Sequence, residues 1–372
     1  MAVIAHLANF YGPRSGGLRT TIHQLARQYA DHGHLVHVIV PGPHDRTVLT
    51  TDAVIHEIGA PTIPGSGGYR AILRMGAVRR VLEQARPDAI ELSDRTTLLP
   101  VAAWARSRGI RVTFIAHERV DGVLHAFAPR LPALPLANRW NRATAARVDR
   151  VVATTTYAAA EFARIGVPVT AVPLGVDITA FGPRRANPHW RRQFPAGPLL
   201  VLASRLSREK RPEFTLDVLR SCLRFGMDAH LVVLGDGPLR SSMQQAATGL
   251  PTTFLGFVSD RSRVAEILAS ADIAMAPGPI ETFGLAALES MASGTPVIAN
   301  EDSALAEILS SGGGQVCPLE ADAWARAAAD LLSDDGVGDR ARMTAERYSW
   351  EATAQRMLAA HDLAAPRTST AS

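Results

Sequence analysis

The stretch AVIAHLANFYGPRSGGLRTTIHQLARQYADHGHLVHVIV, residues 2–40, contains the unit on which the predicted fold rests. Its apolar start, residues 2–8, indicates a buried strand, and a glycine-rich loop over residues 9–17 follows. From Leu18 onward, apolar side chains recur every three or four positions, which is typical of an amphipathic helix. A second apolar run over residues 35–40 indicates another strand, so the order of elements predicts a parallel α/β layer.

The same alternation continues along the chain and is interrupted once. Residues 173–198 are rich in Pro, Gly and Arg and have no sustained period, so we expect them to link two domains. Short apolar runs predict further strands at residues 89–92, 111–116, 150–154, 169–172, 199–203, 230–234, 253–255, 272–276 and 297–299.

These elements predict an α/β protein with two Rossmann-like doubly wound domains that face each other across an interdomain cleft. A length of 372 residues is enough for two hydrophobic cores. We place the N-terminal domain at residues 1–180 and the C-terminal domain at residues 181–349. Residues 350–372 are expected to form a helix that packs back on the first domain, followed by a disordered tail.

Composition and charge exclude several classes of protein. A net charge of +4 gives little support for nucleic-acid binding. The two cysteines are far apart in sequence, which suits a reduced protein without a disulfide scaffold or a structural zinc site. The longest apolar runs fall well short of the roughly 20 residues that a membrane span requires, and the N-terminus does not resemble a signal peptide. We therefore expect a cytoplasmic protein.

Two cations follow the predicted strand at residues 199–203, at the edge of the sheet where doubly wound folds bind ligands. Arg205 and Lys210 are five positions apart, and Lys210 is the only lysine among the 39 basic residues. We expect the pair to neutralise a departing nucleotide diphosphate. A solvated charge cluster is the alternative, because neighbouring charged residues have no assigned role.

The segment from Glu281 to Glu289 is the most informative motif. A helix is predicted from about Gly284, so the amides of Phe283, Gly284 and Leu285 are expected to be unpaired and to bind a diphosphate. The two glutamates are eight residues apart, or roughly 12 Å along a helix, which matches the span of a nucleotide sugar. Taken singly, each glutamate is explained equally well by an ordinary acid at a helix start or on a surface.

Two further features lie at strand ends in the first domain. The loop from Gly12 to Gly17 matches neither a dinucleotide-binding motif nor a P-loop, but Gly16 and Gly17 leave backbone amides accessible to an anion. A plain strand-to-helix turn is the alternative. His117 directly follows the strand at residues 111–116, where a functional role competes with that of a satisfied core or rim histidine.

Together with the GDGP turn at residues 235–238, these motifs resemble retaining family-four glycosyltransferases of the two-Rossmann (GT-B) type, and the resemblance covers essentially the whole chain. More closely, several stretches look like the actinobacterial branch that transfers mannose from GDP-mannose to phosphatidylinositol dimannoside in an alpha-1,6 linkage. Those stretches are ANFYGPRSGGLRT, GGYRA, SDR, HER, VPLGVD, FVSDR and APGPIETFGLAALES.

The resemblance implies a hexosyltransferase whose N-terminal domain binds a lipid-linked acceptor and whose C-terminal domain binds GDP-mannose. It also suggests retention of configuration by front-side attack, with a diphosphate oxygen accepting the acceptor's proton. The implied contacts are those of Glu281 with the hydroxyls of the transferred sugar, Glu289 with the ribose, Arg205 and Lys210 with the diphosphate, His117 with the sugar near its 6-hydroxyl, and Gly16 and Gly17 with the donor phosphates and the acceptor.

The guanine base offers adjacent N–H donors at N1 and N2, which one carboxylate can accept together. Asp260 in the stretch LGFVSDRSR is our candidate, with the backbone from Gly256 to Val258 under the base. The alternative is that Asp260 only caps the helix that begins near Arg261.

A lipid-linked acceptor requires contact with a membrane. Residues 69–80 combine apolar side chains with Tyr69, Arg70, Arg74, Arg79 and Arg80, and residues 123–147 combine arginines with leucines and Trp140. Both segments are suited to an anionic leaflet, so we expect a peripheral protein on the inner face of the plasma membrane. The alternative is that each amphipathic helix faces a core.

The sequence contains no D-x-D motif, so we expect no protein-bound metal and no cofactor, although a divalent cation could accompany the diphosphate. Three other functions stay open: transfer from another nucleotide sugar or to a soluble acceptor, epimerisation of a nucleotide sugar, and binding of a sugar nucleotide without catalysis. The sequence leaves the oligomeric state open.

Overall fold

The computed structural model describes residues 1–12, 16–63, 66, 68–128 and 130–363. The expected disordered tail and part of the loop from Gly12 to Gly17 lie outside these residues. The described residues form two compact units, each around its own sheet. Unit 1 contains Met1–Leu124, Pro129–Leu174 and the segment that begins at Trp350, and unit 2 contains Gly175–Ser349 with His125–Ala128.

The change from unit 1 to unit 2 occurs between Leu174 and Gly175, earlier than the expected boundary after residue 180. We expected residues 173–198 to be a linker, but residues 175–198 belong to unit 2. Their apolar side chains are the reason, because Phe181 and Trp190 are only 0% and 3% exposed. The abundance of Pro, Gly and Arg in this segment concealed these two buried aromatic residues.

Unit 1 is built on an eight-stranded sheet in the order β3-β4-β2-β1-β5-β6-β7-β8, parallel except for β3. The central strand β1 (Val3–Leu7) pairs with β2 (Leu35–Gly42) on one side and with β5 (Ala89–Leu92) on the other. The other elements of unit 1 are α1 (Gly17–Asp31), β3 (Arg46–Leu49), β4 (Val54–Gly59), α2 (Met75–Ala85), α3 (Val101–Arg106), β6 (Arg111–Ala116), α4 (Val120–Phe127), α5 (Ala133–Ala145), β7 (Arg150–Ala153), α6 (Thr156–Ala163), β8 (Thr170–Ala171) and α15 (Trp350–Ala360).

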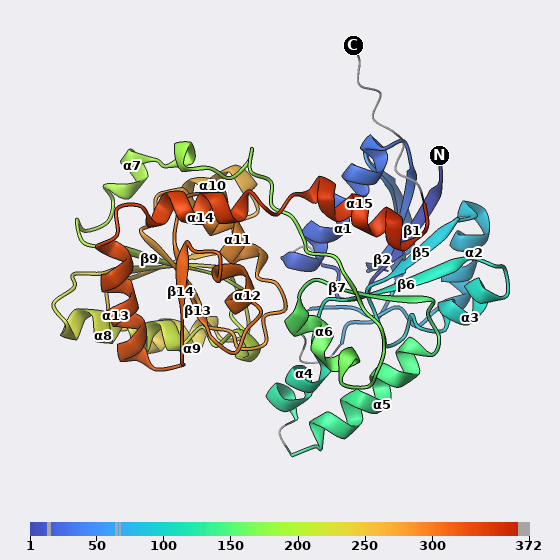
Figure 1. Cartoon of the computed structure of the whole chain (residues 1–372), viewed down its shortest axis with the longest axis horizontal. Coiled ribbons are helices and arrows are strands. Elements are labelled where there is room, and N and C mark those ends of the chain that lie inside the picture. The colour runs from blue at the N-terminus through green and yellow to red at the C-terminus, as the bar shows by residue number, and fades with distance from the viewer. Residues whose placement is uncertain (13–15, 64–65, 67, 129, 364–372) are drawn as a thin grey trace, which may run out of the picture. The chain divides into compact units, whose positions relative to one another are not determined.

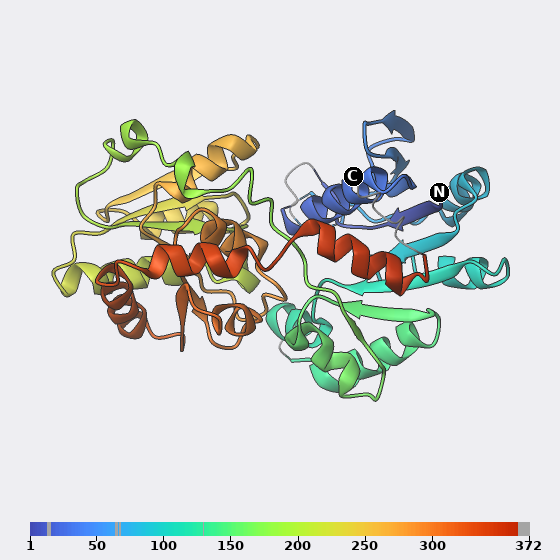
Figure 2. The same cartoon turned by 45° about the horizontal axis from the view of Figure 1, so that its top comes forward.

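Helices cover both faces of this sheet. On one face α1 packs beside α15, and Ile22, Leu25, Met357 and Leu358 lie in one buried cluster with β1 and β2 (Figures 1 and 2). On the other face the core includes α2, α3 and α6, with Phe114 of β6 buried among them. The helix from Trp350 thus packs on the N-terminal unit, although it follows the whole of unit 2 in sequence.

Unit 2 repeats the pattern with a six-stranded sheet in the order β11-β10-β9-β12-β13-β14. All its strand pairs are parallel, and α8 and α13 pack together against its core (Figure 1). Its elements are the 3-10 helices Pro183–Arg185 and Arg208–Lys210, α7 (Pro188–Arg191), β9 (Leu199–Ala203), α8 (Phe214–Arg224), β10 (His230–Leu234), α9 (Arg240–Ala246), β11 (Thr252–Gly256), α10 (Arg261–Ala269), β12 (Ile273–Ala276), α11 (Leu285–Ala292), β13 (Val297–Asn300), α12 (Leu305–Leu309), β14 (Gly314–Cys317), α13 (Ala321–Leu332) and α14 (Val337–Ala345).

The fold class predicted from the sequence is confirmed: both units are Rossmann-like and have parallel α/β layers. The predicted strands exist with ends within a residue or two, whereas β3, β4 and β14 were missed. All four residues of β3 are exposed, and β4 interrupts its apolar residues with His56 and Glu57, so neither strand has a continuous apolar run. Among the described residues, no helix has the length and apolar character needed to span a bilayer.

Candidate active site

Lys210 and Glu281 form an ion pair in unit 2. Lys210 ends the short 3-10 helix after β9, and Glu281 lies in the loop between β12 and α11. The Lys210 Nζ donates a hydrogen bond of 2.5 Å to Glu281 Oε2, and both side chains keep about a quarter of their surface exposed, at 28% and 26%. A Cβ on Gly278 would lie only 3.3 Å from the Lys210 Cα, so a residue without a side chain lets this loop approach the lysine.

The Glu281 carboxylate also accepts hydrogen bonds from the backbone amides of Phe283 and Gly284. Burial raises the pKa of Glu281, but Lys210 and these two amides lower it by more, so its pKa lies below the ordinary value. We had expected these amides to be unpaired, and that expectation is wrong because Glu281 folds back on the start of α11, with Leu285 as its first residue. Lys210, Glu281 and the amides therefore form one cluster of charge and hydrogen-bond donors.

Gly284 is required at the start of α11 for two reasons. Its φ of +87° is in the left-handed region that side chains rarely adopt. A Cβ at this position would also lie 2.6 Å from Leu305 Cδ2. A small cavity of about 40 Å³ adjoins this turn and is lined in part by Lys210, Glu281, Gly284 and Ser290.

The GDGP turn at residues 235–238 supports the segment that carries the two cations. A Cβ on Gly235 would lie 1.9 Å from the Ser204 carbonyl oxygen, and one on Gly237 would lie 2.3 Å from that of Leu206. The Leu206 amide donates to the Asp236 carbonyl at 3.1 Å. The two glycines thus permit backbone contact on both sides of Arg205, which is half-buried.

Glu289 lies on α11 and pairs with an arginine that the sequence analysis did not assign. Arg261 Nη2 lies 2.6 Å from Glu289 Oε1, and the Arg261 guanidinium stacks 4.7 Å from the ring centre of Phe181. The Glu289 side chain is only 10% exposed, and this burial raises its pKa even though Arg261 opposes the shift. The sequence shows Arg261 directly after Asp260 but does not show its partner. The packing of α10 on α11 brings Arg261 to Glu289.

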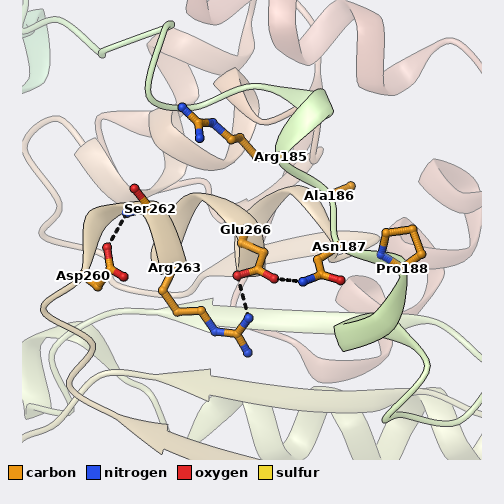
Figure 3. A pocket seen from close by; sticks show the side chains of 8 residues that line it. All are labelled: Arg185, Ala186, Asn187, Pro188, Asp260, Ser262, Arg263 and Glu266. Atoms are coloured by element: carbon orange, nitrogen blue, oxygen red, sulfur yellow. Dashed lines mark hydrogen bonds and ion pairs between the residues drawn. The ribbon is translucent and has the colours of Figure 1, made fainter.

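Asp260 caps α10: its Oδ1 accepts the Ser262 amide at 2.9 Å, and its side chain is exposed. It borders an open pocket of about 400 Å³ that Asn187, Arg263 and Glu266 also line (Figure 3). The cap uses one oxygen of the Asp260 carboxylate. Binding of the guanine base by Asp260 stays a prediction. Gly256 ends β11 with a φ of +72° and Val258 is half-buried, so this turn departs from the strand just before Asp260.

In unit 1, His117 is half-buried at the carboxyl end of β6, and its Nε2 lies 2.8 Å from the Ser93 hydroxyl. Burial, with further contributions from His6 and Arg95, lowers the pKa of His117 to about 3, so this imidazole is neutral at physiological pH. Gly16 is the N-cap of α1 and Gly17 its first residue, and no side chain among the described residues caps this helix start. Part of the loop lies outside the described residues, so its binding of an anion stays a prediction.

The segment at residues 69–80 is partly buried and partly exposed, with Leu73 61% exposed, so its role at a membrane stays a prediction. Its apolar residues Ile72 and Val78 are completely buried in the core, and α2 begins only at Met75. Arg70 donates to the Ala60 carbonyl at 2.5 Å, and Arg74 pairs with Asp45 at 2.7 Å. Ile72 and Val78 are buried because this segment packs on the sheet. Of the four arginines, Arg79 and Arg80 are exposed and have no ion pair with the described residues. Tyr69 is half-buried against Phe10.

The second basic segment keeps its apolar residues on the surface. Leu131, Leu134, Leu136 and Trp140 are 50%, 52%, 39% and 36% exposed. On α5, Leu136, Arg139 and Trp140 are at helical spacing on one side, and residues 130–147 contain no acidic residue. This surface combines positive charge with exposed apolar side chains.

Comparison with known proteins identifies the family. Residues 15–180 match the family model described as Glycosyltransferase Family 4, and residues 197–334 match that of Glycosyl transferases group 1. The chain is 46% identical, over 96% of its length and 95% of the relative, to the GDP-mannose-dependent alpha-(1-6)-phosphatidylinositol dimannoside mannosyltransferase of Mycobacterium tuberculosis. It is 30% identical, over 80% of its length and 79% of the relative, to a GDP-mannose-dependent alpha-mannosyltransferase of Mycolicibacterium smegmatis.

Solved structures agree on the fold. Sucrose-phosphate synthase from Thermosynechococcus elongatus has a TM-score of 0.80 at 20% identity, with 97% of this chain and 98% of that chain covered. Anabaena Alr3699/HepE, solved with UDP and glucose, has a TM-score of 0.75 at 19% identity, with coverage of 97% and 100%. The motifs, the two parallel sheets and these matches lead to one conclusion: the chain belongs to family 4 of the glycosyltransferases and has the GT-B fold.

Proposed function

We propose that this protein transfers mannose from GDP-mannose to a phosphatidylinositol dimannoside acceptor, with retention of configuration and an alpha-1,6 linkage. The observation that carries the proposal is the 46% identity to a mycobacterial relative of that activity over 96% of the chain. In the reaction the bond between the mannose C1 and the diphosphate oxygen breaks, and the acceptor oxygen bonds to C1. The acceptor's proton passes to the departing diphosphate.

The cluster around Lys210 is suited to the donor's charge. When a diphosphate binds, Lys210 and the α11 amides meet an anion with more negative charge than Glu281 offers, so they favour the departing group. Glu281 then accepts hydrogen bonds from the hydroxyls of the transferred sugar. Arg205 adds a second cation beside the same strand end. No metal is needed to supply this positive charge, so we propose a reaction without a protein-bound metal or cofactor.

Three further contacts complete the proposed donor site. Glu289, held by Arg261, accepts the ribose hydroxyls. The free oxygen of Asp260 accepts the guanine N–H groups over the backbone from Gly256 to Val258. In unit 1, His117 contacts the transferred sugar, and Gly16 and Gly17 allow the phosphates and the acceptor to approach.

The acceptor is lipid-linked, so we propose that the protein binds an anionic membrane surface peripherally, on its cytoplasmic face. The exposed side of α5, with Leu136, Arg139 and Trp140, is the surface best suited to it. Apolar side chains enter the headgroup region while arginines pair with lipid phosphates. Arg79 and Arg80 on α2 supply additional positive charge.

Incubation of the purified protein with labelled GDP-mannose and UDP-sugars, with and without mycobacterial lipid extract, tests the proposal. Label in the lipid phase with GDP-mannose alone is the expected result. Isomerised sugar nucleotide without transfer would instead identify an epimerase, and binding without turnover would identify a sugar-nucleotide-binding protein. Transfer to water-soluble glycans only would overturn the lipid acceptor.

A further inference from the structure

A buried ion pair lies behind the loop that carries His117. Arg95 ends the SDR stretch at residues 93–95, directly after β5, and Glu161 is on α6. The Arg95 Nη1 donates to Glu161 Oε1 at 2.9 Å, and the two side chains are only 8% and 0% exposed. The guanidinium also stacks 4.9 Å from the ring centre of Phe114. Two buried charges are costly unless hydrogen bonds satisfy the rest of each group, so the other partners of this pair indicate what it holds.

The remaining hydrogen bonds of the pair reach the backbone of the loop that follows β6. Arg95 Nη2 donates to the Glu118 carbonyl at 2.8 Å. The Glu161 Oε2 accepts the amide of Val120, the first residue of α4, at 2.9 Å. The ion pair therefore fixes the chain at two points directly after His117, one through a carbonyl and one through an amide.

The SDR stretch also contacts His117 itself. The Ser93 hydroxyl lies 2.8 Å from His117 Nε2. Asp94 folds the stretch into a turn, because its carboxylate accepts the amides of Thr96 and Leu98, both at 3.0 Å. The strands β5 and β6 are parallel neighbours, so the loops at their carboxyl ends meet at one edge of the sheet. Consecutive residues after β5 thus contact the imidazole, close the turn and hold the backbone beyond it.

Helix α5 holds Arg95 from the other side. Trp140 Nε1 donates to the Arg95 carbonyl at 3.1 Å. The Oδ1 of Asn141, a completely buried residue, accepts from the Arg95 guanidinium. A guanidinium with several donors in a rigid fork is suited to hold three acceptors at once. Arg95 is therefore fixed through both its backbone and its side chain.

We propose that Arg95 is a positioning residue for the transfer reaction: paired with Glu161, it fixes the backbone that follows His117 and so places the imidazole beside the transferred sugar. The inference rests on the proposed function for the contact between His117 and that sugar. A pair that served stability alone could be replaced by apolar side chains of similar volume without an effect on catalysis, and this difference provides the test.

The double substitution Arg95→Met with Glu161→Leu separates positioning from stability. Both charges are removed together, so no unpaired charge is left buried, and the protein should fold with a Tm within a few degrees of the parent. Both contacts with the loop are lost. We expect kcat for mannose transfer to fall by roughly tenfold to a hundredfold, because a small displacement of a reacting group has an effect of that order. Affinity for GDP, which has no sugar to contact His117, should stay within about twofold of the parent.

Two single substitutions complete the comparison. Val112 is buried near the opposite end of β6, about 16 Å along the strand from His117. Val112→Ala should therefore lower the Tm and leave kcat within about twofold of the parent. Arg95→Lys replaces the fork by one ammonium, so it should keep Glu161, lose the Glu118 carbonyl and recover only part of kcat. A folded double variant with parental kcat, or an equal loss of kcat in Val112→Ala, would overturn the proposal.

The environment of His117 is also measured without substrate. In protein labelled with 15N-histidine, the ring signals of His117 are identified among those of the 12 histidines by their loss in His117→Gln. We expect these signals to shift or broaden in the double variant and to stay unchanged in Val112→Ala. Unchanged signals in the double variant would contradict the positioning role. A parent enzyme that transfers no mannose would instead contradict the proposed function, and the NMR result would still decide the positioning.

Discussion

Lys210 and Glu281 are separated by 71 residues in sequence, yet their ammonium and carboxylate groups are 2.5 Å apart. The pair joins the segment after β9 to the turn before α11. In this arrangement Glu281 takes the hydrogen bonds that a donor diphosphate would take, from the lysine and from the Phe283 and Gly284 amides. Under the proposed function, donor binding would exchange one anion for another at the same hydrogen-bond donors.

Lys210→Ala should lose most of its turnover and still fold. The lysine opposes the charge that develops on the diphosphate, and loss of such a contact typically costs about 2.7 to 4 kcal/mol in the transition state. Lys210→Arg should recover only part of kcat, because guanidinium and ammonium differ in geometry and hydration. Steady-state kinetics measure both, and Arg208→Ala, at an exposed neighbour, is the control. A near-parental rate in Lys210→Ala would remove this residue from the diphosphate site.

Glu289→Gln should weaken GDP binding by roughly tenfold, since a hydrogen bond from the ribose to a charged acceptor is lost. Calorimetry with GDP measures this change.

The effect of Glu289 on the stability of the protein depends on pH. Burial raises the folded pKa of Glu289 above its ordinary value of 4.5, so the stability that protonation gives is fully present below that value and is lost as pH rises through the folded pKa. Between about pH 4 and pH 8 the Tm of the parent should therefore fall relative to that of the variant. Parallel curves would contradict the raised pKa.

The two roles of Asp260 can be separated by two substitutions. Asp260→Ala removes the cap of α10 and should cost about 1 kcal/mol of stability, whereas Asp260→Ser keeps a capping oxygen and should cost much less. Neither variant can accept both guanine N–H groups on a carboxylate, so both should lose the preference for GDP over UDP. Calorimetry with the two nucleotides measures this preference. If Asp260→Ser retained it, Asp260 would be a helix cap only.

Charge reversal on α5 should release the protein from vesicles that contain phosphatidylinositol. Each arginine near an anionic surface contributes about 1 kcal/mol, so Arg139→Glu with Arg142→Glu should weaken sedimentation with vesicles by more than tenfold. Replacement of Arg70, Arg74, Arg79 and Arg80 by alanine should weaken it less, because two of these arginines already have partners within unit 1. GDP affinity should be unchanged in both. Stronger release by the second set would place the membrane surface at α2.

The fold was predictable because each buried strand of a parallel sheet has a nearly continuous apolar run. The run at residues 230–234 is an example: it forms β10, with its last four residues buried. The edge elements were not predictable in this way, since β3 and β14 have little buried apolar surface. The composition of residues 173–198 predicted a linker, but the buried Phe181 and Trp190 pack residues 175–198 into unit 2.

The candidate site was predictable where a motif is contiguous. Glu281, Glu289 and the cations after β9 could be proposed as site residues from their spacing, but the sequence could not reveal that Glu281 pairs with Lys210. Arg261 and Arg95 were missed for a related reason. Their partners lie 28 and up to 66 residues away, so only the folded chain brings them together.

The return of α15 to unit 1 has a consequence for synthesis on the ribosome. The His361 ring that donates to Glu91 leaves the exit tunnel after all of unit 2, and the buried residues of α15 are part of the first unit's core. A nascent chain that ends before Trp350 therefore has an open apolar face beside α1 and a carboxylate that lacks one of its donors. The N-terminal half can acquire its sheet before unit 2 is synthesised, but its final packing requires residues 350–361, which are made after unit 2.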